Sequence, residues 1–143
     1  MRTLHHELGI IKIPGPDDSL DGLYRLSQGA AFWAADTETT GLNQYKADFH
    51  VRIVQVGVKD EAWILRPEFH QQAIVDLTTK ENTWWHNYLY DAISLEESEG
   101  MDFDEVAYNA KDTEIIARLI DPRGRDKGGT GHKLEQLTAH YLG

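Results

Sequence analysis

Short apolar runs separated by polar turns mark the first half of the chain. Residues 31–36 form an apolar run that ends in a carboxylate, and residues 51–58 are rich in β-branched side chains, which favour strands. Residues 59–61 are a connection short enough for a hairpin into a further apolar run at 62–65. Three successive strands of this kind predict an antiparallel meander.

The apolar spacing then lengthens to that of helices. Pro67 suits the first turn of a helix, and Phe69, Ala73 and Leu77 recur four residues apart. The same reasoning predicts other helices near residues 20–29, 89–100, 113–121 and 134–142, and short strands at 8–13, 82–86 and 106–108. Strands that alternate with helices indicate an α/β protein, a mixed sheet with helices packed on it.

Length and composition narrow the class of protein. The 143 residues suffice for one domain with a single core, and 41% of them are hydrophobic. The absence of cysteine excludes disulfides and thiolate zinc sites. No apolar run approaches the roughly 20 residues that span a bilayer, and His5, His6 and Glu7 stand where a signal peptide needs apolar residues. We therefore expect a cytoplasmic protein without a membrane partner.

The charge balance bears on possible partners. The formal net charge is -10, with 24 acidic and 14 basic residues. Proteins that hold nucleic acid by bulk electrostatics are basic, so this class is disfavoured. The net charge remains compatible with an acidic protein that recruits cations and acts on the end of a nucleic-acid strand.

The first candidate chemistry lies at the end of the first buried strand. Side chains two residues apart in a strand share a face, so Asp36 and Glu38 project in the same direction. Two adjacent like charges repel each other unless a cation lies between them, and carboxylates are ligands that Mg²⁺ prefers. The pair is interpreted as half of a divalent-metal site, or alternatively as two unrelated acids at a solvated strand end.

A second set of candidates lies where a strand leads into a helix. His86 and Asn87 precede Asp91, which falls in the first turn of the expected helix, near the positive end of its dipole. Asp91 is a candidate functional acid or an ordinary dipole partner, whereas His86 and Asn87 are interpreted as groups that bond the backbone. Asp112 is interpreted as the cap of the helix that follows it.

These residues resemble the motifs of a known family. The segment 36–42, Asp-Thr-Glu-Thr-Thr-Gly-Leu, resembles the first motif of the DEDD 3′–5′ exonucleases, and His86-Asn87 with Asp91 resembles the second. Residues 112–122 and 129–142 are similar to the segments that follow, most of all in the exonuclease domains of bacteriophage and bacterial family-A DNA polymerases. The resemblance implies a ribonuclease-H-like fold, incomplete at the C-terminus.

The same resemblance implies a domain organisation and an activity. Residues 1–143 are expected to form one exonuclease-like domain, with 1–29 as an N-terminal extension and 30–143 as the core without the last motif. The implied reaction is metal-dependent hydrolysis that removes nucleotides from the 3′ end of single-stranded DNA, as in proofreading during DNA replication. The expected cofactors are two Mg²⁺ or Mn²⁺ ions.

The resemblance also assigns roles to individual residues. Asp36 bridges both ions, Glu38 serves one ion and bonds the terminal 3′-hydroxyl, and Asp91 serves the second ion. For the substrate, the resemblance implies that Leu42 wedges against the terminal base. It also implies that Thr40 and Asn87 position the sugar and phosphate.

One departure from the family pattern limits these expectations. The family uses four acids, and the fourth belongs to a third motif, Tyr-x-x-x-Asp or His-x-x-x-x-Asp. His140 and Tyr141 have no aspartate after them, so the two-metal site is expected to be only partly formed. Four interpretations stay open: part of a longer or split polymerase, complementation by a second chain, an acid borrowed from elsewhere, or a catalytically inactive module kept for binding.

Overall fold

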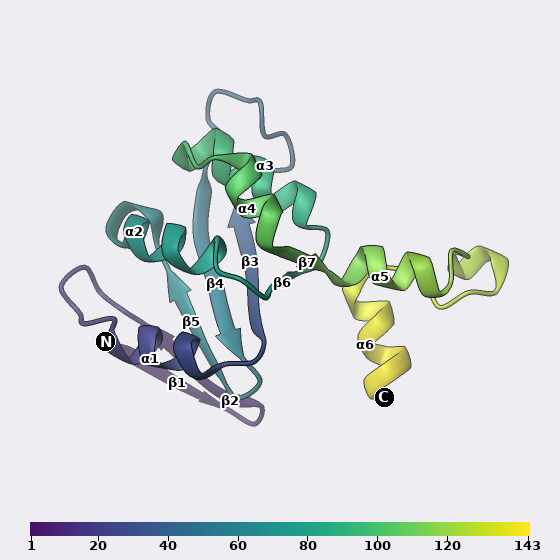
Figure 1. Ribbon diagram of the computed structural model, residues 1–143, viewed down its shortest axis with the longest axis horizontal. Coiled ribbons are helices and arrows are strands. Elements are labelled where there is room, and N and C mark those ends of the chain that lie inside the picture. The colour runs from purple at the N-terminus through teal and green to yellow at the C-terminus, as the bar shows by residue number, and fades with distance from the viewer.

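A seven-stranded mixed sheet in the order β1-β2-β5-β4-β3-β6-β7 organises the molecule (Figure 1). The coordinates are a computed structural model that describes residues 1–143. The strands are β1 Arg2–His6, β2 Gly9–Ile13, β3 Trp33–Thr39, β4 Val51–Val58, β5 Glu61–Leu65, β6 Thr83–Trp85 and β7 Ala110–Asp112. The helices are α1 Asp21–Gly29, α2 Pro67–Thr78, α3 Tyr88–Glu99, α4 Phe103–Asn109, α5 Thr113–Ile120 and α6 Leu134–Leu142, with a 3₁₀ turn at Arg125–Lys127.

The predicted meander is confirmed. Strand β3 pairs antiparallel with β4, and β4 with β5. Burial alternates strictly along β3, where Trp33, Ala35 and Thr37 are buried while Asp36 and Glu38 are exposed. The sheet therefore has one face turned to the core and an open face that carries the two acids.

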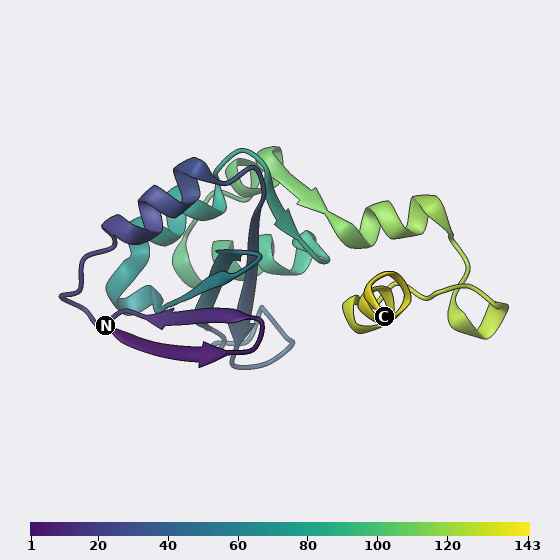
Figure 2. The ribbon, with the colours of Figure 1, turned by 90° about the horizontal axis from the view of Figure 1, so that it is seen from below.

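Helices α2 and α3 contact the central strands and cover the buried face of the sheet, while α1 lies over the same layer (Figure 2). Each large apolar side chain buried there contributes about 1.5–3 kcal/mol to folding. Among the buried core residues are Leu23, Trp33, Val54, Val56, Trp63, Leu65, Ile74, Leu77, Trp85, Leu95 and Val106. This packing fixes the ends of β3 and α3, from which the candidate acids project.

The N-terminal segment forms a hairpin that the sequence predicted only in part. Strand β2 matches the expectation for 8–13, and it pairs parallel with β5. Strand β1 was not predicted, because all five of its residues are exposed and no apolar alternation marks it. Its strand conformation comes from antiparallel pairing with β2.

The prediction of a strand at 106–108 is wrong, because these residues belong to helix α4. The carboxylate of Asp102 accepts a hydrogen bond from the backbone N–H of Asp104 and caps this helix. Val106 is fully buried against the core. The acidic residues that precede Val106 thus begin a helix, and a strand follows this helix as β7, parallel to β6.

Helices α5 and α6 extend away from the sheet (Figures 1 and 2). Several apolar side chains of α5 face solvent, and Leu119 is 79% exposed. No helix of the protein combines the length and apolarity needed to cross a bilayer.

Candidate active site

The open face of β3 carries the first pair of acids. Asp36 lies opposite Gln55 of β4 in the strand register. The side-chain amide of Gln55 lies 3.5 Å from Asp36 Oδ2 and 3.5 Å from Glu38 Oε1, so one neutral donor stands between two carboxylates. The register of β3 shifts between Glu38 and Thr39, and such a bulge re-aims the side chains beside it.

The electrostatics of this pair are unfavourable without a cation. Partial burial raises the pKa of Asp36, and the negative charge of Glu38 raises it further. A backbone hydrogen bond from Thr37 and the nearby His86 act in the opposite direction. No lysine or arginine forms an ion pair with either acid. Two hard oxygen donors that lack a counter-charge are a donor set suited to a divalent cation.

The third acid, Asp91, projects from the first turn of α3. Its Oδ1 accepts a hydrogen bond from the backbone N–H of Thr37 at 3.0 Å and another from the Thr37 hydroxyl at 2.6 Å. Asp91 is only 3% exposed. Burial raises its pKa to about 7; the Thr37 hydroxyl bond opposes that shift, and the negative charge of Asp36 adds to it.

The structure therefore brings the three acids to the same stretch of β3, but on different sides of it. Asp36 and Glu38 project to the open face, whereas Asp91 bonds Thr37, which faces the helices. No group of three histidine, cysteine, aspartate or glutamate side chains is placed to hold one ion. The arrangement is a surface pair of carboxylates with a buried acid behind it.

The expected substrate contacts lie around the loop after β3. Leu42 is 89% exposed on this loop. The Thr40 hydroxyl is engaged within the loop, where it donates to the carbonyl of Asp48 and accepts from the N–H of His50. Asn87 has a φ of 66° and donates its backbone N–H to Asp112. The side chain of Leu42 is thus free for a ligand, while Thr40 is committed to shaping the loop.

Two residues that brace this loop were missed by sequence reasoning. The Tyr90 hydroxyl lies 2.8 Å from Thr39 Oγ1 and donates to the carbonyl of Gly41 at 2.9 Å. Gln44 donates to the carbonyl of Tyr90 at 2.6 Å. Tyr90 precedes Asp91 directly, so α3 holds both the third acid and the loop that presents Leu42. In the sequence, only the position of Tyr90 next to Asp91 could have indicated that Tyr90 braces this loop.

Asp112 is confirmed as a helix cap and does more than was predicted. Its carboxylate accepts hydrogen bonds from the backbone N–H groups of Glu114 and Ile115 at the start of α5. It also accepts from Asn87 and Tyr88 at the start of α3. One 8%-exposed acid therefore joins the starts of two helices, and one of these helices carries Asp91.

Replacing Asp112 by alanine is expected to destabilise the protein by about 2–4 kcal/mol, because it leaves four backbone donors without their acceptor. The measurement is urea unfolding followed by far-UV circular dichroism. Asp102→Ala is the matched control, since Asp102 caps α4 through a single bond. Equal losses in the two variants would contradict the joint role of Asp112.

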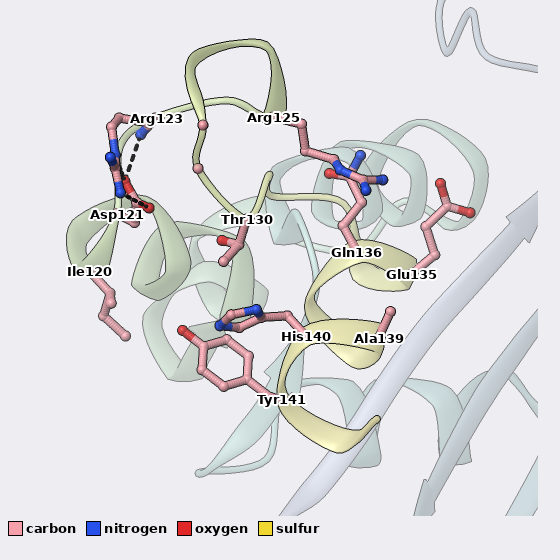
Figure 3. A pocket seen from close by; sticks show the side chains of 12 residues that line it. Ile120, Asp121, Arg123, Arg125, Thr130, Glu135, Gln136, Ala139, His140 and Tyr141 are labelled. Carbon is pink, nitrogen blue, oxygen red and sulfur yellow. Dashed lines mark hydrogen bonds and ion pairs between the residues drawn. The ribbon is translucent and has the colours of Figure 1, made fainter.

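A separate cavity of about 900 Å³ lies between the end of α5, the following loop and α6 (Figure 3). Arg123 on this loop is neutralised by Asp121, with distances of 2.8 and 3.0 Å between their side chains. Arg125 lines the cavity and forms no ion pair. The pairing of Arg123 reduces the positive charge that the loop offers to a phosphate.

The strand order of the sheet is that of the ribonuclease-H-like fold. The chain belongs to the 3′–5′ exonuclease family, whose family model matches residues 13–143. It is 34% identical over 158 aligned positions to the DNA polymerase of Mycobacterium phage D29, which covers 99% of this chain and 25% of that polymerase. It is 35% identical over 113 positions to the DNA polymerase of Mycobacterium phage L5, covering 76% of this chain and 19% of the relative. The chain thus spans a quarter or less of these polymerases.

Solved structures confirm the fold. The catalytic core of RRP6 from Trypanosoma brucei superposes with a TM-score of 0.71 at 15% identity, over 98% of this chain and 36% of that one. NrnC from Brucella melitensis, solved with bound Mg²⁺, gives a TM-score of 0.57 at 18% identity, over 92% of this chain and 59% of that one. The ribonuclease-H-like prediction is therefore confirmed, and members of this exonuclease family generally use divalent metal ions.

Proposed function

We propose that this chain is a proofreading-type exonuclease that removes nucleotides from the 3′ end of single-stranded DNA by metal-dependent hydrolysis. The observation that supports this most is the pair Asp36 and Glu38 on the open face, with Asp91 bonded to the residue between them. The negative charges of Asp36 and Glu38 repel each other, and no lysine or arginine forms an ion pair with them. A divalent ion would relieve this repulsion.

In this proposal the acids have distinct tasks. Asp36 and Glu38 hold the cations at the open face, and Glu38 also accepts a hydrogen bond from the terminal 3′-hydroxyl. Asp91 contributes a third carboxylate from behind the strand. When bound there, two Mg²⁺ or Mn²⁺ ions would supply Lewis-acid chemistry, lowering the pKa of the attacking water and stabilising the charge on the leaving oxygen. The amide of Gln55 keeps the first two carboxylates in place.

The substrate contacts follow from the loop after β3. Leu42 packs against the terminal base, because a leucine that is 89% exposed on this loop offers an apolar surface that a base can cover. Thr40 acts by shaping that loop through its bonds to Asp48 and His50. Asn87 lies exposed at the start of α3, where its side chain is free to position sugar or phosphate.

The proposed biological setting is a DNA polymerase. The phage relatives contain the matching region as a quarter or less of a longer chain, so the remainder of a polymerase, or a complementing chain, is the proposed partner. We propose residues 1–143 as one exonuclease-like domain in which 1–29 is an extension of the core 30–143. The parallel pairing of β2 with β5 and the full burial of Leu23 support a single unit.

One observation favours the alternative, a catalytically inactive exonuclease fold kept for binding. The three acids do not form a single group that could hold an ion. The alternative predicts binding of partners or single strands without turnover.

The test is a release assay on 5′-labelled single-stranded DNA with either Mg²⁺ or Mn²⁺. The proposal predicts a ladder that shortens one nucleotide at a time from the 3′ end, and no shortening in excess chelator. A substrate whose 3′ end carries a phosphorothioate linkage is the matched control and should resist. If neither metal supports shortening, the catalytic proposal fails for this chain and the binding module remains.

A further inference from the structure

The residue that follows strand β6 lies beside the first candidate acid. The parallel register pairs Ala34 of β3 with Trp84 of β6. Two residues further on, Asp36 and His86 therefore take matching positions on neighbouring segments (Figure 1). Burial alternates along this stretch, where Trp85 is buried while Trp84 and His86 are partly exposed. Because side chains two residues apart in a strand share a face, His86 projects to the open face that carries Asp36.

A cavity of about 320 Å³ on the open face has both Asp36 and His86 in its wall. His86 is the only titratable side chain besides Asp36 that lines this cavity. The two residues form no ion pair with each other, and the space exceeds the roughly 30 Å³ that a water molecule occupies. The geometry therefore places one nitrogen base where a water molecule fits next to Asp36.

The hydrogen bonds of His86 determine which of its ring nitrogens carries the hydrogen. The Thr113 hydroxyl donates to the backbone carbonyl of Trp85 at 3.0 Å. Because a hydroxyl has a single hydrogen, Thr113 accepts from His86 Nδ1, which lies 2.9 Å away. Nδ1 thus carries the hydrogen, and in the neutral ring Nε2 presents a lone pair that no group of the protein engages. A histidine oriented through one nitrogen, with the other free, has the arrangement of a general base.

The reaction of the proposed function needs such a group. Hydrolysis requires that the attacking water lose a proton, and histidine is the side chain that most often accepts it in enzymes. In the proposed function Asp36 and Glu38 hold cations. Asp91 is buried and accepts two hydrogen bonds from Thr37. Of the titratable groups near the open face, His86 alone is left without another task.

We propose that His86 is the general base of nucleotide release, its Nε2 accepting a proton from the attacking water, and that Thr113 is a positioning residue that fixes the tautomer. The inference rests on the proposed function. The water oxygen forms a bond to the phosphorus of the terminal nucleotide, while the bond from this phosphorus to the 3′ oxygen of the preceding nucleotide breaks. The leaving oxygen keeps the electron pair and takes a proton from solvent, and His86 returns its proton to solvent. The products are a nucleoside 5′-monophosphate and a strand that is one nucleotide shorter.

The first test is the rate of nucleotide release from 5′-labelled single-stranded DNA in saturating Mg²⁺. His86→Asn keeps an amide donor for Thr113 in place of Nδ1 but has no basic nitrogen. It is expected to lower kcat about a hundredfold and to leave KM unchanged, since only proton transfer is lost. Free imidazole should restore part of the rate of His86→Ala, whereas Asp36→Asn should not respond to imidazole.

The second test needs no turnover. In the metal-free protein, long-range ¹H–¹⁵N spectra of the histidine rings should show His86 with its hydrogen on Nδ1. Thr113→Val removes the hydroxyl acceptor and should give a mixture of the two tautomers, whereas Thr113→Ser should keep the single one. In the release assay, Thr113→Val should lower kcat about tenfold, as expected when the partner that orients a histidine is lost, and Thr113→Ser should restore it.

His5→Asn is the matched control, because His5 is an exposed histidine on the edge strand β1. Release by His86→Asn at the rate of the unchanged protein would overturn the assignment of the base and leave the exonuclease function intact. Loss of Mn²⁺ binding by His86→Asn in calorimetry would also overturn it, because His86 would then be a metal ligand. Absence of release by the unchanged protein would reject the exonuclease function and, with it, the base. The two failures are therefore distinguishable.

Discussion

Asp36→Asn is expected to lower the rate of 3′-nucleotide release about a thousandfold or more in saturating Mg²⁺. Asparagine keeps the shape of the side chain but removes the charge that holds a cation, and a lost metal contribution of several kcal/mol corresponds to a loss of this size. The measurement is the initial rate of shortening of 5′-labelled single-stranded DNA.

The folded state should tolerate this substitution. Burial and Glu38 raise the pKa of Asp36, so a neutral side chain relieves repulsion at that position. Asp17→Asn is the matched control, because Asp17 is an exposed acid in the turn before α1 and its side chain makes no hydrogen bond or ion pair in the structure. An Asp36→Asn protein that retains a tenth or more of the activity, an order-of-magnitude criterion, would remove Asp36 from the proposed mechanism.

The fold was predictable wherever burial leaves a periodic trace. The alternation of buried and exposed residues in β3 and the β-branched run of β4 predicted the meander, and Asp112 predicted the start of α5. Strand β1 has no buried residue, so no pattern could mark it. Helix α4 was predicted as a strand at 106–108, because it is only seven residues long and a single buried residue, Val106, marks its core side.

The site was predictable as residue types but not as geometry. Strand periodicity predicts that Asp36 and Glu38 share a face of the sheet, and in the structure both are exposed on the same face of β3. The partners of the acids depend on which segments meet in space. The neighbour of Asp36 is Gln55 through the strand register, and that of Asp91 is Thr37 through helix packing. Neither pair has a signal in the local sequence, because the residues lie 19 and 54 positions apart.

The geometry of Asp91 nevertheless has a functional implication. A buried carboxylate that lies near another acid lowers the stability of the folded state, whereas a buried amide would satisfy the same two donors of Thr37. A charged group kept in such a position indicates a function that needs the charge, as expected at an active site. Stability and activity should therefore respond in opposite directions when the charge is removed.

Asp91→Asn is expected to stabilise the metal-free protein at pH 8 and to abolish most nucleotide release. Burial raises the pKa of Asp91 to about 7 in the folded state, from 3.8. Between about pH 4 and pH 7 the folded state then binds more protons than the unfolded state, so stability falls as the pH rises. The full difference is at most about 4 kcal/mol, because one pKa unit corresponds to about 1.4 kcal/mol.

The measurement is urea unfolding in chelator at several pH values, with the difference in free energy of unfolding between Asp91→Asn and the unchanged protein as the readout. This difference should be near zero below about pH 4 and should grow to its full value above about pH 7. Asp104→Asn is the matched control, since Asp104 occupies the first turn of α4 but is exposed. This substitution removes a similar interaction with the helix dipole, but it removes no buried charge. Asp104→Asn should therefore be slightly less stable than the unchanged protein. If the difference in free energy of unfolding for Asp91→Asn does not change with pH, then the charge of Asp91 does not destabilise the folded state. The metal-binding role assigned to Asp91 would then lose its physical basis.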